Sequence, residues 1–356
     1  MSLALTLGRR GLGNAWPNPA VGAVVVKDGV VVGRGWTQPG GRPHAEVEAL
    51  ARAGEAARGA TLYATLEPCS HHGRTPPCVD AILAAGIARV VSALEDPNPK
   101  VAGEGHARLR AQGIAVGLGV GAEEARRAHA GHIRRLRDGR PHVLLKVAVS
   151  ADGKVGLPGR KPARVTGEAA NARVHLMRAT NDAVLTGIGT VLADDPQLTC
   201  RLPGMESRSP VRVVLDSRLR LPTGSRLAKS ATRTLDWVFV DESVKPEHED
   251  ALTQAGVEVL RVPGAAGRLD LAAVLRGLAG RGITRVMVEA GPIVSAAFVA
   301  ADLVDEAALF RSPNALGEGI DALEGMALSA LTLSPKLRLV GREQVGADTL
   351  EMFERK

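Results

Sequence analysis

The chain has 356 residues, 45% of them hydrophobic, which suits two domains of ordinary size. Its three Cys exclude a disulfide framework, and without a signal peptide or an apolar run of about 18 residues no membrane association is expected, so we expect a cytoplasmic protein. The net charge of +7 lies mostly in residues 1–141, with 18 Lys and Arg against 12 Asp and Glu, whereas residues 142–356 hold 27 against 26. Because only three Trp, one Tyr and four Phe are present to stack on bases, we expect no nucleic acid partner; a small phosphorylated substrate would also use positive charge.

The first predicted elements are a short helix and a β-hairpin. The pattern predicts a helix over Leu3–Arg10 and strands over Ala23–Val26 and Val30–Gly33, because an Asp-Gly turn between β-branched runs is a hairpin signal. Between helix and hairpin, prolines hold Trp16–Gly22 extended, and Asn18 there offers both a donor and acceptors to the edge of a base.

Next comes a constellation typical of metal chemistry. His44, Cys69 and Cys78 can bind zinc tetrahedrally and leave the fourth position to water. Glu46 is not needed as a ligand and is placed to move protons to and from that water. His-x-Glu followed by Pro-Cys and a further Cys is typical of zinc-dependent base deaminases. The alternatives are a structural zinc, which would need a fourth protein ligand, and two buried free thiols, which would leave His44 and Glu46 unexplained.

Strands and helices alternate around this motif and predict a three-layer α/β domain. The predicted elements are a helix from Glu46 to Ala57, a strand over Thr61–Leu66, a helix over Cys78–Ala85 and a strand over Arg89–Leu94. A basic run over Arg126–Arg137 has helical character. The polar segment Leu136–His142 is broken by Gly and Pro, so we predict two domains, residues 1–140 and 143–356.

The second half again alternates strand and helix. The predicted elements are strands at His142–Ser150, Ala183–Thr186, Val211–Leu215, Trp237–Val240, Val257–Leu260, Arg285–Glu289 and Leu303–Phe310, with a helix over Glu168–Arg178. Gly187-x-Gly189 does not match a dinucleotide-binding loop, because Leu192 stands where the motif needs Gly or Ala. Glu289–Pro292 lies where a strand meets a helix N-terminus, where backbone amides can hold a phosphate.

Several of these segments resemble the bifunctional riboflavin-pathway deaminase-reductases over nearly the whole chain. The most specific is the eight-residue insert Ser70–Pro77 between the two Cys, followed by Asp96–Gly103, Ser150-x-Asp152-Gly153, Thr190–Thr199 and Val288–Pro292. The resemblance implies an α/β chain with an N-terminal cytidine-deaminase-like three-layer domain and a C-terminal dihydrofolate-reductase-like domain. It also implies Zn and NADPH as cofactors, a small phosphorylated pyrimidine as substrate and a homo-oligomer, dimer or tetramer.

The resemblance further assigns roles to individual residues. Metal ligands would be His44, Cys69 and Cys78, and catalytic residues Glu46 and Asp194. The substrate would contact Asn18, His71, Lys146, Thr166, Arg178, Leu198, Arg201 and Glu289. NADPH would contact Ala148, Arg164, Thr190, Asp194, Ser217, Gly291, Pro292, Ile293, Val294, Ser295, Ala296 and Ala297. Two positions depart from the family pattern, since Thr37 replaces a His and Arg164 replaces a Trp.

The resemblance therefore implies two successive reactions on one substrate. The first is zinc-dependent hydrolytic deamination of the 2,5-diamino-6-ribosylamino-4(3H)-pyrimidinone 5′-phosphate. The second is NADPH-dependent reduction of its ribosyl side chain to give 5-amino-6-ribitylaminouracil 5′-phosphate. A deaminase of RNA or free nucleosides and a non-catalytic zinc-stabilised scaffold that binds a nucleotide are the competing interpretations.

Overall fold

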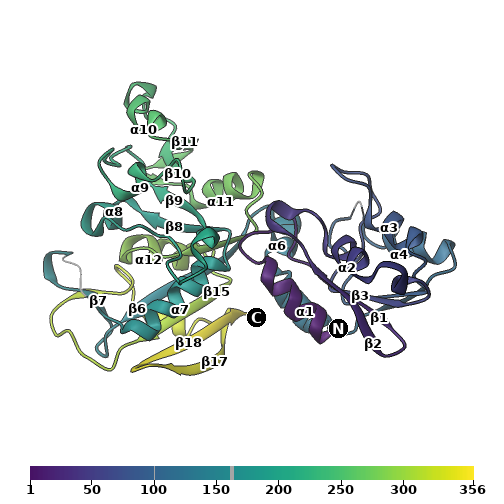
Figure 1. Cartoon of the computed structure of the whole chain (residues 1–356). Helices are drawn as coiled ribbons and strands as arrows, with labels where there is room; N and C mark the ends of the chain where they lie inside the picture. The colour runs from purple at the N-terminus through teal and green to yellow at the C-terminus, as the bar shows by residue number, and fades with distance from the viewer. Residues whose placement is uncertain (100, 161–163) are drawn as a thin grey trace. The chain divides into compact units, whose positions relative to one another are not determined.

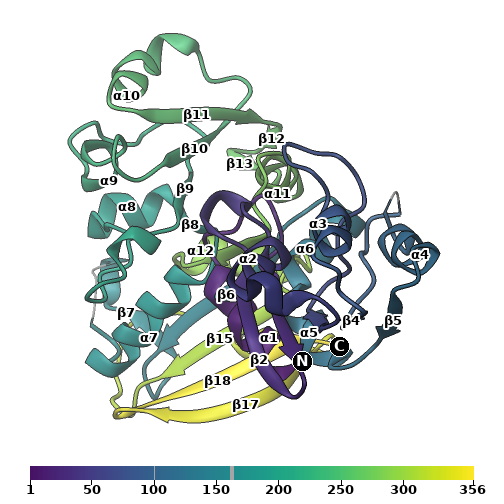
Figure 2. The same cartoon turned by 45° about the vertical axis from the view of Figure 1, so that its right-hand side comes forward.

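The structure is a computed structural model that describes residues 1–99, 101–160 and 164–356. The chain forms two compact units, drawn in Figure 1 and, turned by 45°, in Figure 2. The first comprises Met1–Pro141 with Ala279–Thr284, and the second comprises His142–Leu278 with Arg285–Lys356. None of the described helices combines the length and hydropathy needed to cross a bilayer.

The first unit is built on a five-stranded sheet in the order β2-β1-β3-β4-β5. Its strands are β1 (Gly22–Lys27), β2 (Val30–Trp36), β3 (Thr61–Ala64), β4 (Arg89–Ser92) and β5 (Ala115–Leu118). Its α-helices are α1 (Ser2–Gly8), α2 (Ala45–Ala53), α3 (Cys78–Ala84), α4 (Glu104–Ala111), α5 (Ala122–Ala128) and α6 (Ala130–Asp138). Strand β1 pairs antiparallel with β2 and β3, whereas β3, β4 and β5 run parallel.

Alternation along β1 divides the core of this unit between two faces of the sheet. Ala23 and Val25 belong to the cluster that includes buried residues of α2, α3 and α4. Val24 points the other way and packs with residues of α1. Because successive strand residues face opposite sides, helices cover both faces, which gives the three layers expected for the first half.

Glycines let these helices lie directly on the sheet. A Cβ atom at Gly22 would lie 1.9 Å from the carbonyl oxygen of Ala4 in α1, and one at Gly35 would lie 2.2 Å from that of Ala45 in α2. No side chain fits in such a gap, so these positions require glycine. The close approach of α2 fixes the helix whose first turn follows the predicted metal ligand His44.

Most predicted elements of the first unit are confirmed, with differences at their ends. Asp28 and Gly29 form the hairpin turn with φ of 49° and 77°, as a two-residue loop requires. Helix α2 ends at Ala53 and continues as a 3-10 turn to Ala57, and β3 ends at Ala64 before the metal-bearing loop. The basic run is two helices rather than one, because the chain leaves helical geometry at His129.

The second unit contains a nine-stranded sheet in the order β11-β10-β9-β8-β14-β6-β15-β18-β17. Its strands are β6 (His142–Val149), β8 (Ala183–Gly187), β9 (Val211–Leu215), β10 (Asp236–Asp241), β11 (Val257–Val262), β14 (Arg285–Val288), β15 (Glu306–Arg311), β17 (Leu337–Val345) and β18 (Asp348–Arg355). Short strands are β7 (Lys154–Gly156), β12 (Gly264–Ala265), β13 (Arg268–Leu269) and β16 (Ile320–Asp321).

The helices of this unit connect parallel strands. They are α7 (Glu168–Ala179), α8 (Ile188–Asp194), α9 (Arg226–Lys229), α10 (Asp250–Gln254), α11 (Leu271–Gly280), α12 (Pro292–Ala300) and α13 (Ser329–Thr332). Short 3-10 turns over the whole chain are η1 (Arg9–Gly11), η2 (Pro39–Gly41), η3 (Gly54–Ala57), η4 (Pro158–Arg160), η5 (Glu206–Arg208) and η6 (Pro246–His248). Val174 and Met177 of α7 pack with Met287 and Phe310 of the sheet.

Among the described strands of the large sheet, only β18 runs against the direction of the others. Strand β18 pairs antiparallel with β15 and with β17. Strands β17 and β18 form a C-terminal hairpin that was not predicted from the sequence. The strand predicted from Leu303 begins only at Glu306. The seven strands from β11 to β15 in this order run parallel, so their carboxyl ends lie at one edge, where ligands of open α/β sheets bind.

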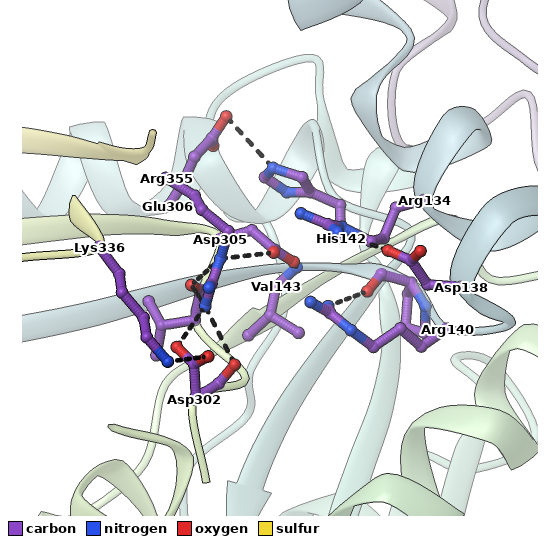
Figure 3. A network of polar contacts seen from close by, with 12 residues as sticks. Arg134, Asp138, Arg140, His142, Val143, Asp302, Asp305, Glu306, Lys336 and Arg355 are labelled. Carbon is purple, nitrogen blue, oxygen red and sulfur yellow. Dashed lines mark hydrogen bonds and ion pairs between the residues drawn. The ribbon is translucent and has the colours of Figure 1, made fainter. Parts of the chain in front are cut away.

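Ionic contacts attach the C-terminal strand to the neighbouring loops (Figure 3). Arg355 of β18 donates to the Asp302 carboxylate at 2.9 Å and lies 3.4 Å from Asp305. The buried Asp305 carboxylate also accepts the Val143 amide at 3.0 Å, and Lys336 binds Asp302 at 2.5 Å. The chain end is therefore fixed to the start of the central strand β6.

A buried ion pair joins β9 and β10. Arg212 is fully buried, and its guanidinium lies 2.6 Å and 2.8 Å from the two carboxylate oxygens of Asp236. It also donates to the Ser230 hydroxyl at 2.7 Å. Burial raises the pKa of Asp236 to about 7, and Arg212 acts against that shift.

We predict that Arg212→Met lowers the free energy of unfolding by about 3–5 kcal/mol, because it leaves the Asp236 carboxylate buried without its cation. Urea denaturation followed by circular dichroism measures the loss. The double variant Arg212→Met/Asp236→Leu removes both charges and should recover most of the stability. Equal stability of the single variant and the wild type would contradict the prediction.

His129 is a buried histidine at the junction of α5 and α6. Its Nε2 lies 3.0 Å from the Thr65 hydroxyl, which also accepts the Gly22 amide at 3.1 Å. Burial lowers the pKa of His129 to about 3. The unfolded chain, with a histidine pKa of about 6.5, therefore binds the proton more tightly than the folded chain does.

We predict that stability falls as the pH is lowered below the unfolded histidine value, by up to about 1.4 kcal/mol per pH unit from this residue. The loss should continue until the pH reaches the folded pKa of about 3. His129→Gln keeps a donor for Thr65 and should show a shallower decline between pH 7 and pH 5 in urea denaturation. His72→Gln, at an exposed position, should decline like the wild type, and parallel curves for His129→Gln would contradict the prediction.

Candidate active sites

Two helix N-termini and one loop bring the three predicted metal ligands together. His44 directly precedes α2, Cys78 is the first residue of α3, and Cys69 lies in the loop after β3. His44 Nδ1 lies 3.2 Å from Cys78 Sγ and 3.6 Å from Cys69 Sγ, and the three ligand atoms lie within 4.8 Å of one another. No fourth His, Cys, Asp or Glu of the described residues joins this group. One imidazole and two sulfurs with an open corner fit a catalytic zinc ion.

Hydrogen bonds prepare one of the two sulfurs to be a thiolate. The Cys78 side chain, followed by His44 and the Cys78 backbone amide, lowers the pKa of Cys69 to about 4 against the opposing effect of burial. The Cys78 amide donates to Cys69 Sγ at 3.2 Å. The hydrogen bond with Cys69 and burial raise the pKa of Cys78. Zinc binds the thiolate form of cysteine, so the negative charge on Cys69 favours binding of a cation.

Glu46 lies in the first turn of α2, two residues after His44, and is 3% exposed. Burial raises its pKa to about 7. A carboxyl group with this pKa exchanges its proton near neutral pH, as a general acid-base catalyst must.

The Asn18 loop contacts the metal site directly. Asn18 Nδ2 lies 3.1 Å from His44 Nε2 and donates to the Gly41 carbonyl at 2.9 Å. Thr37, where the family has His, is buried and bonds the Pro19 carbonyl and the Val21 amide at 2.9 Å and 3.0 Å. It supports the loop that carries Asn18.

The insert between the two Cys lies beside this site. His71 in the insert is exposed. Arg42 was not predicted, but its guanidinium lies 3.4 Å from His44 Nε2 and also donates to Thr75 of the insert. Its position two residues before His44 was the only sequence signal.

In the second unit, buried Arg178 and half-buried Glu289 and Lys146 form a charged cluster. Arg178 binds both Glu289 oxygens at 2.8 Å and donates to the Thr199 carbonyl at 3.0 Å, and Lys146 Nζ lies 3.9 Å from Glu289. Burial alone would raise the pKa of Glu289, but Arg178 and Lys146 hold it below its ordinary value. Three predicted substrate residues are thus together, with two Arg178 N–H groups left for a ligand.

The neighbouring loop adds further predicted substrate residues. Arg201 donates from Nη1 to the Thr199 hydroxyl at 3.4 Å, and its amide lies 3.2 Å from His175 Nδ1. Leu198 is buried with a φ of 54°, a left-handed conformation that bends the loop. His175 was missed, although its position three residues before Arg178 puts both on one face of α7. Thr166 is half-buried just before α7.

Two helix starts at the carboxyl ends of β8 and β14 carry the predicted cofactor residues. The Gly291 amide donates to the Thr190 hydroxyl at 3.2 Å, and a Cβ at Gly187 would lie 2.8 Å from Val294. The segment from Gly291 to Ala297 therefore forms the N-terminal part of α12 and lies next to the first turn of α8. Backbone amides at such starts bind phosphate groups.

The remaining predicted cofactor residues are more dispersed. Ser217 follows β9 and donates to the Gly267 carbonyl at 2.8 Å, and Ala148 lies in β6. Arg164 is exposed and lies 3.7 Å from Glu168. Asp194 is the last residue of α8, and its side chain is exposed. Partial desolvation of the carboxyl group raises its pKa.

Comparison with known families matches both halves of the chain. Residues 1–94 match the family described as the cytidine and deoxycytidylate deaminase zinc-binding region, and residues 141–350 match the RibD C-terminal domain. The riboflavin biosynthesis protein RibD of Escherichia coli K12 is 41% identical over 98% of this chain and 96% of its own length. That of Aquifex aeolicus is 39% identical over 100% and 97%.

Solved structures agree with the sequence relatives. RibD of Acinetobacter baumannii is similar with a TM-score of 0.87 and 37% identity, covering 100% of this chain and 97% of its own. The diaminohydroxyphosphoribosylaminopyrimidine deaminase/5-amino-6-(5-phosphoribosylamino)uracil reductase of Thermotoga maritima has a TM-score of 0.85 and 38% identity, with the same coverage. Identity at this level over the full length, with a zinc-binding deaminase region joined to a RibD C-terminal domain, means that the chain belongs to the RibD family.

Proposed function

We propose that this chain is a bifunctional deaminase-reductase of riboflavin biosynthesis, with the deaminase in residues 1–140 and the reductase in residues 143–356. Its substrate is the 2,5-diamino-6-ribosylamino-4(3H)-pyrimidinone 5′-phosphate, and its final product is 5-amino-6-ribitylaminouracil 5′-phosphate. The observation that carries the proposal is the group of His44, Cys69 and Cys78 with the buried Glu46 beside it. We further infer a cytoplasmic homo-oligomer, a dimer or tetramer.

In the deaminase, the chain supplies ligands, proton transfer and orientation. His44, Cys69 and Cys78 would hold a zinc ion, and the chemistry that zinc would supply is the activation of water. Glu46 would take a proton from the attacking water and deliver protons to the ring and to the amino group that leaves as ammonia. Asn18 and His71 orient the pyrimidine at this position.

In the reductase, the charged cluster holds the substrate and the two helix starts hold the cofactor. Arg178, Arg201, Thr166 and Leu198 face the ribose phosphate, with Lys146 and Glu289 at the same site. NADPH would supply the hydride that reduces the former anomeric carbon of the opened ribosyl group. Hydride addition to this carbon displaces an electron pair onto the atom bonded to it. Asp194 is the proton donor to that atom.

We predict that Glu46→Gln lowers the rate of ammonia release by about 100-fold or more, because the amide cannot move protons. NADPH oxidation on the deaminated intermediate should continue at the wild-type rate. A coupled ammonia assay and the absorbance of reduced nicotinamide measure the two activities on the same preparation.

Glu48→Gln is the matched control, because Glu48 lies in the same first turn but pairs with Arg52 on the surface of α2. It should leave both activities unchanged. Loss of both activities in a folded, zinc-loaded Glu46→Gln variant would show that the two reactions do not divide as proposed.

We also predict that Asp194→Asn lowers reductase turnover by about 100-fold, the usual contribution of a positioned acid, and spares deamination. Asp195→Asn is the control, since the neighbouring carboxylate accepts the Arg226 amide at 2.8 Å. Unchanged NADPH oxidation in Asp194→Asn would remove Asp194 from the proposed chemistry.

A further inference from the structure

Glu67, two residues before the metal ligand Cys69, is a buried carboxylate bound entirely by backbone amides. One oxygen accepts the amides of Asp96 and Gly103, each at 3.0 Å. The other accepts those of Gly105 and His106 at 2.8 Å and 3.2 Å. Glu67 is 5% exposed, so these four bonds replace the water that the carboxylate loses on folding.

The charge of Glu67 is balanced by a helix rather than by a basic side chain. In the described part of the chain its ion-pair partner is His106, whose Nδ1 lies 3.9 Å away. Burial lowers the pKa of His106, so that ring is neutral at pH 7. Three of the four donors, Gly103, Gly105 and His106, belong to the N-terminus of α4, where the helix dipole favours a negative charge. Glu67 is thus an N-cap supplied by a distant part of the chain.

The backbone next to Glu67 is pressed against the same helix. A Cβ atom at Gly105 would lie 2.2 Å from the Pro68 carbonyl oxygen, so the first turn of α4 accepts no side chain there. Pro68 itself fixes one backbone dihedral between Glu67 and Cys69. The anchor and the metal ligand are therefore joined by a single restricted residue.

On its other side, Cys69 is held by α3. Its sulfur accepts the Cys78 amide at 3.2 Å, and its carbonyl accepts the Val79 amide at 3.2 Å. The Cys69 loop is consequently held at two helix N-termini. The N-terminus of α3 binds the Cys69 sulfur, and that of α4 binds the Glu67 carboxylate.

We propose that Glu67 is a positioning residue of the metal centre: by capping α4 it holds Cys69 Sγ where it can share one ion with His44 and Cys78. This inference rests on the proposed zinc function. Groups that orient metal ligands without touching the metal commonly change metal affinity by about 10- to 100-fold. In Glu67→Gln one oxygen becomes an NH₂ group, which repels two of the four amides and frees the loop.

The test is the zinc affinity of the full-length protein, measured by competition with a chromophoric chelator. Glu67→Gln should bind zinc about 10- to 100-fold more weakly than the wild type. Glu67→Asp keeps the charge but withdraws the oxygens by one methylene, and an intermediate loss is expected. If Glu67→Gln does not fold, Glu67→Asp is the variant whose zinc affinity tests the proposal. Reductase turnover on the deaminated intermediate should be unchanged in both.

Glu104→Gln is the matched control, because Glu104 lies in the first turn of the same helix with an exposed side chain. It should keep wild-type zinc affinity. Zinc affinity within twofold of the wild type in folded Glu67→Gln or Glu67→Asp, or an equal loss in Glu104→Gln, would overturn the role of Glu67. Failure of the wild type to bind zinc would instead overturn the proposed function.

Discussion

The deaminase half depends on one constraint: three soft or borderline ligand atoms from separate elements must meet around a single ion. His44 and Cys78 stand at the starts of α2 and α3, and Cys69 comes from a loop between them. Helix starts suit this task because their backbone amides are free to bind sulfur and carboxylate. The Cys78 amide does so with Cys69, and the α4 amides do so with Glu67.

Close packing makes this arrangement rigid. Strand β2 carries Gly35 opposite Ala45 of α2, and Gly105 of α4 meets the Pro68 carbonyl. Where helix and neighbouring backbone approach this closely, a shift of one displaces the other, since packed interiors have little free volume. Buried Glu46 lies on the helix fixed in this way, so the proposed acid-base group and the proposed ligand His44 keep one geometry.

The reductase half uses a different solution, a parallel sheet with ligand groups at the carboxyl ends of its strands. Glu289 follows β14, and Thr190 and Gly291 open the helices after β8 and β14. Arg178 reaches this edge from α7 and is oriented by both Glu289 oxygens. The Glu289 carboxylate thus preorganises the Arg178 guanidinium, which lowers the conformational cost of binding an anion there.

The sequence by itself determined the chemistry, the family and most elements. His44, Glu46, Cys69 and Cys78 have residue types and spacings that few other functions need, and periodicity placed β9 and most other predicted strands to within a few residues. Only the tertiary structure decided which distant groups support these residues and strands. The capping of α4 by Glu67, the Arg178–Glu289 pair and the antiparallel pairing of β18 with β15 join residues far apart in the chain. Such contacts leave no local period or turn signal, because they arise from packing between elements rather than from the preferences of any one segment.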